Sequence, residues 1–293
     1  MIPFSFLQAW SAVAPWPDLR QIEQDLIICR ALCDLFTAPA LKGKIAFRGG
    51  TAINKLLFQR PLRYSEDIDL VQIQAEPIGP IVNAIRDALA WLGPCKRDQA
   101  GHSMHLVFKF APEADPATSL KVKVEINTRE HVQFLGIRHY PFSVDSDWYR
   151  ATAEIASFEA EELFATKLRA LLQRRKNRDL FDLLHGLEHV PLDLDKLVAC
   201  FDHYLVLEGN PMSRAQAEQR MLDKLSRSLI EDIAPLLPAG VSFTDHDAAC
   251  AFEKIWIHLI ARIKGEPWKM TEAVIAELRK AKYPDLLAGL DCV

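Results

Sequence analysis

Two aspartates separated by one residue are the feature of this sequence that most directly suggests chemistry. Asp67 and Asp69 lie in the segment 65–71, in which acidic and apolar residues alternate as they do in a strand. Side chains at positions i and i+2 of a strand point to the same face, about 7 Å apart at ~3.3 Å per residue. Two such carboxylates repel each other unless a cation neutralises them, and Mg²⁺ suits them because it prefers oxygen ligands. Two Mg²⁺ ions held by such a pair would support phosphoryl or nucleotidyl transfer.

A pair of glycines precedes the aspartates by fewer than twenty residues. Gly49 and Gly50 follow a short apolar run, and a segment with helical spacing begins at Thr51. Glycines let the backbone approach a phosphate closely, and the N–H groups at the start of a helix attract anions. We therefore expect these three residues, with Ser65 beside the aspartates, to bind the phosphates of a nucleotide.

Three other interpretations of the aspartate pair compete with a magnesium site. Phosphatases that use the first Asp of Asp-x-Asp as a nucleophile place an apolar strand directly before it, whereas Tyr64, Ser65 and Glu66 precede Asp67 here. Calcium sites require a looped run of alternating oxygen ligands, which is absent from this segment. The pair could also be a solvated strand face beside an ordinary turn. Asp is disfavoured in strands, and the glycine turn and the acid pair occur in one unit, so the sequence favours a magnesium site.

A third acid stands in another alternating segment, 120–126. Glu125 is the sole acid on its face, which it shares with Lys121 and Lys123. A third carboxylate on a neighbouring strand would complete a two-metal site, either as a ligand or as the group that accepts a proton from the attacking hydroxyl. The alternative is an exposed side chain that pairs with one of the lysines.

Basic and acidic residues meet later in the chain, around a helix break. Lys167 and Arg174 are seven residues apart and share a side of one predicted helix, and Asp179 begins the next. A lysine supplies a point charge for a triphosphate, and arginines supply forked donors. The alternatives are structural: an acid at a helix start, an Arg178–Asp182 pair worth a few tenths of a kcal/mol, or a solvated basic face.

These motifs resemble a known family. The run 47–70, the strand around Glu125 and the run 166–183 are similar to the AbiEii/MenT-type toxins of the nucleotidyltransferase superfamily, which belong to bacterial toxin–antitoxin and phage-defence systems. The resemblance implies that Asp67, Asp69 and Glu125 bind two Mg²⁺ ions and that Lys167 holds the triphosphate of an NTP. It further implies that the segment containing Arg178, Asp179 and Asp182 shapes the nucleotide site.

The resemblance also implies a reaction and its partners. The toxin would transfer NMP from NTP to the 3′ end of tRNA and would be countered by a separately encoded antitoxin. The rival interpretations are transfer to a small molecule or a protein side chain, and a non-catalytic binding module with the same fold. The presence of all three acids argues against the last.

Composition limits the class of protein. The net charge is −4, so contact with RNA would require a local basic patch rather than a general positive field. No apolar run is long enough to span a membrane, and the first residues lack the pattern of a signal peptide. The six cysteines are scattered and form no zinc-type pairs, which favours the cytoplasm. The histidines occur singly on helical patterns, and we predict structural roles for them.

The predicted fold class is α/β. A small mixed sheet with flanking helices, residues 1–156, is expected to carry the acids and to be followed by an all-helical domain, residues 157–293. The segment 138–158 is predicted to be an irregular connection. We expect the active cleft between the two domains, with Lys167 contributed by the helical one.

Overall fold

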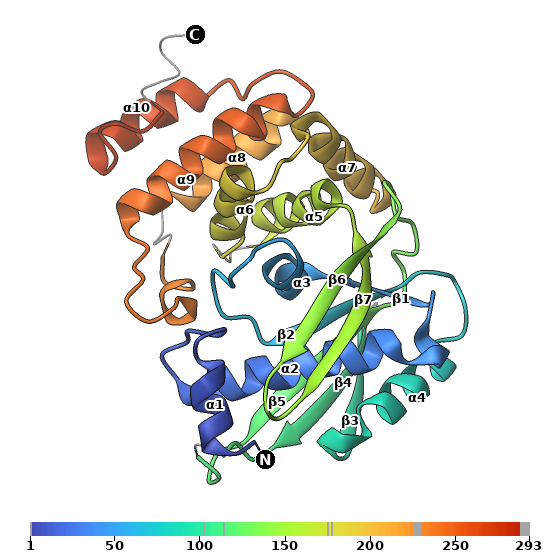
Figure 1. The fold of residues 1–293 in the computed structure, drawn as a ribbon. Coiled ribbons are helices and arrows are strands. Elements are labelled where there is room, and N and C mark those ends of the chain that lie inside the picture. Colours follow the sequence, from blue (N-terminus) through green and yellow to red (C-terminus); the bar gives the residue numbers. More distant parts are fainter. Residues whose placement is uncertain are drawn as a thin grey trace. The chain divides into compact units, whose positions relative to one another are not determined.

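The structure is a computed structural model that describes residues 2–101, 103–113, 115–174, 176, 178–225 and 230–287. It divides into two compact units (Figure 1). The first contains Met1–Glu159 and Leu236–Val241, and the second contains Ala160–Pro235 and Ser242–Val293. The division into two separate domains, residues 1–156 and 157–293, stays a prediction.

The first unit is built on a mixed sheet of seven strands in the order β3-β4-β5-β2-β1-β7-β6. Two central contacts are parallel, β2 with β5 and β1 with β7, and the other neighbours are antiparallel. The strands are β1 (Ile45–Arg48), β2 (Asp67–Gln72), β3 (Cys95–Ala100), β4 (Ser103–Phe110), β5 (Leu120–Asn127), β6 (Ile137–Asp145) and β7 (Arg150–Phe158).

The helices of this unit bury one face of the sheet. The apolar core joins α2 and α4 to strand residues such as Ile68, Leu70 and Val124. Because side chains alternate along a strand, Asp67 and Asp69 point to the opposite face of β2. The helical elements are α1 (Phe4–Trp10), α2 (Leu19–Thr37), η1 (Pro39–Leu41), α3 (Gly49–Leu56), α4 (Ile78–Ala88) and η2 (Ala90–Leu92).

The prediction of an irregular connection over 138–158 is wrong, because this segment forms the hairpin β6–β7. β6 is an edge strand that buries only Tyr140 and Val144, so its apolar alternation is weak. Pro141 is tolerated there because an edge strand leaves part of its N–H groups unpaired. The sequence also failed to indicate β3, a polar strand at the other edge.

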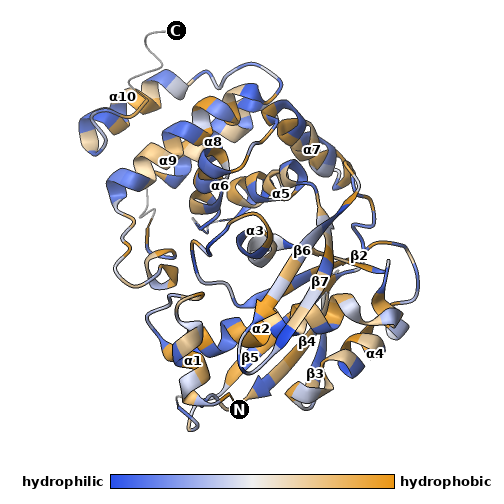
Figure 2. Cartoon of the chain, in the orientation of Figure 1, coloured by the Kyte–Doolittle hydropathy of each residue, from blue (hydrophilic) through white to orange (hydrophobic). Residues whose placement is uncertain are grey.

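All regular elements described in the second unit are helical. Figure 2 shows hydrophilic and hydrophobic stretches along α9 and α10, as expected for helices with one face in a core. Thr244 and Asp247 form a capping box at the start of α9. The elements are α5 (Ala160–Gln173), α6 (Arg178–His189), α7 (Leu194–Leu207), α8 (Arg214–Lys224), η3 (Ala234–Leu236, whose last residue belongs to the first unit), α9 (Asp245–His258), η4 (Ile260–Arg262) and α10 (Thr271–Ala281).

The predicted fold class, an α/β unit followed by helices, is confirmed. In the part of the chain that the structure describes, no helix combines the length and the apolar character needed to cross a bilayer. Cys29 and Cys33 are buried in α2, as their helical spacing indicates.

Candidate active site

The parallel pairing of β2 with β5 brings the three predicted carboxylates together in the first unit. Asp69 lies opposite Glu125, and Asp67 lies opposite Lys123. Registered residues on neighbouring strands point to the same face of a sheet. Asp67, Asp69 and Glu125 therefore share the face that the core leaves uncovered.

Lys123 lies between two of these acids. Its Nζ is 3.4 Å from Oδ2 of Asp67 and 3.1 Å from Oε2 of Glu125. All three side chains are 27–32% exposed, so solvent screens the attraction. Burial raises the pKa of Glu125, but the hydrogen bond and the charge of Lys123 outweigh this and hold the pKa below its ordinary value. For Lys123, burial lowers the pKa, yet the charge of Asp67 and the bond to Glu125 raise it overall.

Further polar side chains of neighbouring strands surround Glu125 and Asp69. His105 of β4 lies opposite Glu125, with Nε2 3.4 Å from the carboxylate, and Ser103 donates a hydrogen bond to it. Arg48 of β1 lies opposite Asp69 and forms an ion pair with Glu130. Sequence reasoning missed these residues, because only the strand register assigns them to this face.

Gly49 lies directly against Asp69. Its φ is +82°, a conformation that favours glycine, and a Cβ at this position would lie 2.1 Å from Oδ2 of Asp69. Helix α3 begins at the same residue, and the first N–H groups of a helix have no partner within it. The glycine thus lets the start of a helix and a carboxylate approach each other more closely than any other residue would.

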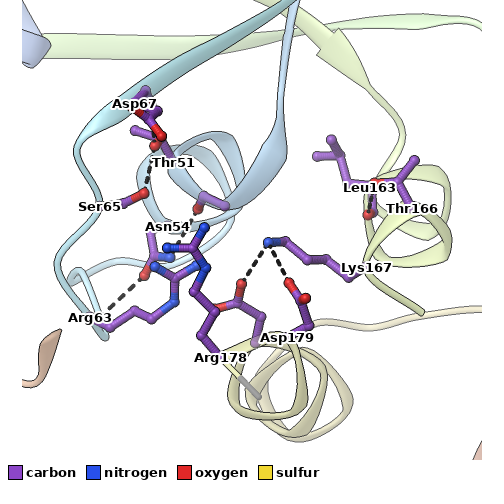
Figure 3. A network of polar contacts seen from close by, with 12 residues as sticks. Thr51, Asn54, Arg63, Ser65, Asp67, Leu163, Thr166, Lys167, Arg178 and Asp179 are labelled. Atoms are coloured by element: carbon purple, nitrogen blue, oxygen red, sulfur yellow. Dashed lines mark hydrogen bonds and ion pairs between the residues drawn. The ribbon is translucent and has the colours of Figure 1, made fainter. Parts of the chain in front are cut away.

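Thr51 and Ser65 connect α3 to β2 (Figure 3). The hydroxyl of Thr51 donates a 2.5 Å hydrogen bond to the carbonyl of Asp67 and lies 2.7 Å from Oγ of Ser65. Thr51 is 1% exposed. Its hydroxyl therefore positions the backbone of Asp67.

A second polar cluster lies within the helical unit and contains three of the predicted residues (Figure 3). Nζ of Lys167 on α5 is 3.1 Å from Asp179 and 3.0 Å from Asp182, both on α6. Arg174 donates two 2.7 Å hydrogen bonds to Asp179. Burial raises the pKa of Asp179, but the charges of Lys167 and Arg174 keep it below its ordinary value. The cluster holds the end of α5 against the start of α6.

The arginine that pairs with Asp179 is Arg174, whereas the sequence assigned Arg178 to the nucleotide site. Arg178 is the first residue of α6, and its backbone N–H donates to Asp232 at 3.3 Å. Within the described part of the chain, its Nε has no hydrogen-bond partner. The seven-residue spacing of Lys167 and Arg174, which puts both on one side of the predicted helix, was the signal available in the sequence.

A model of the family described as nucleotidyl transferase AbiEii toxin, type IV toxin–antitoxin system, matches residues 30–251. The chain belongs to this AbiEii family. It is therefore a nucleotidyltransferase toxin, for which membership implies an NTP substrate and a cognate antitoxin. The matched region contains the acids of the sheet and the cluster around Lys167.

Solved structures share the fold of this AbiEii protein. MenT4, a nucleotidyltransferase toxin from Mycobacterium tuberculosis H37Rv, is 15% identical, with 99% of each chain covered and a TM-score of 0.65. JHP933 from Helicobacter pylori is 16% identical, with 93% of this chain and 98% of that chain covered and a TM-score of 0.51. At these identities the likeness shows the fold alone. Comparison with curated proteins finds no match.

Proposed function

We propose that this toxin transfers NMP from an NTP to the 3′ end of tRNA in a Mg²⁺-dependent reaction, and that it does so in the cytoplasm. The observation that carries the proposal is the pairing of Asp69 with Glu125, beside the helix that starts at Gly49. It supplies carboxylates for metal ions next to backbone amides for phosphates, the two requirements of a nucleotide triphosphate site.

The residues of the carboxylate face fit Mg²⁺. Asp67, Asp69 and Glu125 offer the hard oxygen ligands that this ion prefers. Two of these acids share the single ammonium of Lys123. When bound, Mg²⁺ would offset the charge of the triphosphate and polarise the phosphoryl group under attack. We propose these three acids as its ligands.

The remaining residues of the first unit would position the nucleotide. We propose that the amides of Gly49 and Gly50 bind its phosphates, and that Thr51 and Ser65 fix this turn through their hydrogen bonds to β2 and to each other. The pKa of Glu125 lies below its ordinary value, whereas a general base works best with a pKa near the operating pH. Its charge therefore suits a metal ligand better than a proton acceptor.

In the helical unit, we propose that Lys167 binds the triphosphate. Its ammonium is held by Asp179 and Asp182, so its position is fixed before a nucleotide arrives. We also propose that Arg178 is a further cation for the nucleotide. Within the part of the chain that the structure describes, its Nε is buried and has no hydrogen-bond acceptor.

Transfer assays with different acceptors test this proposal. The protein is incubated with Mg²⁺ and one α-labelled NTP at a time, and each reaction contains one acceptor: intact tRNA, periodate-oxidised tRNA, cell protein or a metabolite extract. Label in intact tRNA alone would support the proposal, because periodate destroys the terminal diol. Label in oxidised tRNA would contradict addition at the 3′ end, and label only in protein or metabolites would contradict tRNA as the acceptor.

A further inference from the structure

The second half of α6 presents a group of side chains that the nucleotidyl transfer does not use. His185, Glu188 and His189 have the spacing i, i+3 and i+4, which places them on one side of a helix. Residues Asp179 and Asp182, which bind Lys167, belong to the first half of the same helix.

The donor atoms of this group lie close to one another. Oε2 of Glu188 is 3.7 Å from Nδ1 of His185 and 4.0 Å from Nε2 of His189. One ligand atom from each residue lies within 4.8 Å of the other two. The two imidazole rings are nearly parallel, with centroids 5.6 Å apart. In a tetrahedral site with bonds of about 2.0–2.2 Å, the ligand atoms lie about 3.3–3.6 Å from one another.

Two neighbouring side chains contact this group. The ring of His185 packs edge-on against Phe181, with centroids 4.3 Å apart. Nζ of Lys254 on α9 binds Oε1 of Glu188 at 2.5 Å, while Oε2 is the oxygen nearer the histidines. Among the side-chain atoms that the structure describes, Nδ1 of His185 is shielded from solvent and has no hydrogen-bond partner.

A buried imidazole nitrogen without a partner loses its interaction with water and gains nothing in return. A metal ion bonded to its lone pair would remove that cost. Ligation by the partly exposed residues His189 and Glu188, 53% and 32% exposed, would leave at least one coordination position open to solvent.

We propose that His185, Glu188 and His189 form a binding site for a divalent transition metal ion of the Zn²⁺ type, distinct from the carboxylate face of the sheet. Two imidazoles and one carboxylate are an established ligand set for Zn²⁺. Imidazole favours Zn²⁺, Ni²⁺ and Cu²⁺, whereas Mg²⁺ prefers oxygen ligands, so the two sites would select different ions. An ion here would clamp the end of α6 and stabilise the helical unit.

Calorimetric titration of the full, chelator-treated chain with Zn²⁺ tests the proposal. We expect saturable binding at one strong site in the wild type, and at least about tenfold weaker binding in His185→Ala and His189→Ala. His139→Ala removes an exposed histidine of the first unit and should bind Zn²⁺ like the wild type. Asp69→Asn should also retain the site, and excess Mg²⁺ should not displace the ion.

His189→Ala is the decisive variant, since its side chain is about half exposed and its loss should not disturb folding. Zn²⁺ should raise the thermal unfolding temperature of the wild type and of His139→Ala, but not that of His189→Ala. The absence of saturable binding, or equal binding by wild type and His189→Ala, would overturn the proposal whatever the outcome of transfer assays.

Discussion

Gly49 meets two constraints at once, a positive φ and the close approach of the Asp69 carboxylate. Gly43 also has a positive φ, of +73°, but a Cβ there would meet nothing within 4 Å. Replacing Gly43 by alanine therefore measures the cost of a strained backbone alone. Replacing Gly49 by alanine adds the effect of displacing the Asp69 carboxylate.

We expect Gly49→Ala to lower transfer activity by about 10²-fold or more, because a displacement of about 1 Å in a catalytic group has effects of this size. Gly43→Ala should lose only about 1–2 kcal/mol of unfolding free energy and should keep its activity. Labelled NTP transfer and chemical denaturation measure the two quantities. Equal activity in both variants would show that Asp69 does not depend on this approach.

Lys123 supplies positive charge between Asp67 and Glu125. If a metal ion takes over this neutralisation, then Lys123→Met should bind Mn²⁺ several-fold more tightly than the wild type, as measured by calorimetry. Its unfolding free energy without metal should fall by no more than about 1 kcal/mol, since the pairs are partly exposed.

Lys121→Met is the matched control for this change, because Lys121 lies two residues earlier on the same face of β5 and is exposed. It should leave Mn²⁺ affinity unchanged. Weaker binding in Lys123→Met would instead mean that the lysine orients the acids for the metal.

The sequence contains enough information to predict Asp67 and Asp69 as neighbours, because their spacing alone decides the face of a strand. It does not reveal that Lys123, rather than Lys121, lies beside Asp67. That contact depends on the register of β2 with β5, two strands separated by about fifty residues of sequence.

At the scale of the elements, Gly186 shows how tightly α5 and α6 pack. A Cβ on Gly186 would lie 2.4 Å from the ring of Phe164. Gly186→Ala should therefore lower the unfolding free energy by about 1–3 kcal/mol, despite the higher helix propensity of alanine. Gly79→Ala in α4 has open space around its Cβ and should be neutral or stabilising. Denaturant unfolding measures the unfolding free energy of both variants. A Gly186→Ala variant as stable as the wild type would contradict this packing.

A buried ion pair joins α2 to α3. Nζ of Lys55 is 2.6 Å from Oδ2 of Asp25, whose carboxylate also accepts hydrogen bonds from Trp10 and Trp16. Burial lowers the pKa of Lys55, but the charge of Asp25 raises it above its ordinary value overall. Because the folded-state pKa is raised, the pair's contribution is complete below the unfolded pKa of about 10.4 and is lost only as pH rises through the folded value.

Asp25→Ala should cost about 3–5 kcal/mol of unfolding free energy at about pH 6. The loss should be smaller at about pH 9, because burial without Asp25 lowers the pKa of Lys55 and lets it lose its proton. Glu76→Ala, which removes a partly exposed partner of Lys44, should cost less than about 1 kcal/mol. Urea unfolding at both pH values checks these figures. A loss that grows from about pH 6 to about pH 9 would contradict the raised pKa of Lys55 in the wild type.

The elements that position the acids follow from local patterns, whereas the edges of the sheet do not. β2 and β5 alternate clearly because one face of each is buried. β3 and β6 lie at the edges and bury few side chains, so their sequences carry little periodicity. The same physical cause explains which strands could be predicted and which could not.

At the scale of the whole molecule, the chain belongs to the AbiEii family and combines a sheet unit with a helical unit. Each unit contains one of the predicted polar clusters, the carboxylates on the sheet and Lys167 with its aspartates on the helices. Neither cluster could have been assembled from sequence spacing alone, because strand register builds the first and the packing of α5 on α6 builds the second.

The net charge of −4 gives this toxin no general attraction for RNA. Arg174, part of the basic run before α6, is bound to Asp179. Binding of tRNA would therefore depend on local contacts, and binding of a triphosphate at the carboxylate face, as proposed, would require the charge of these acids to be neutralised. Metal binding by these acids is accordingly the central claim.

The most direct test measures labelled NTP transfer against Mg²⁺ concentration for the wild type, Asp69→Asn and Asp87→Asn. Asp87 is an exposed aspartate on α4, a helix that packs on the opposite face of the sheet, so its change makes the same substitution away from the site. We predict that transfer by the wild type and Asp87→Asn rises and saturates with Mg²⁺, and that Asp69→Asn is at least about 10²-fold slower at every concentration. Equal transfer by Asp69→Asn and Asp87→Asn, or transfer unaffected by removal of divalent ions, would contradict metal binding by these acids.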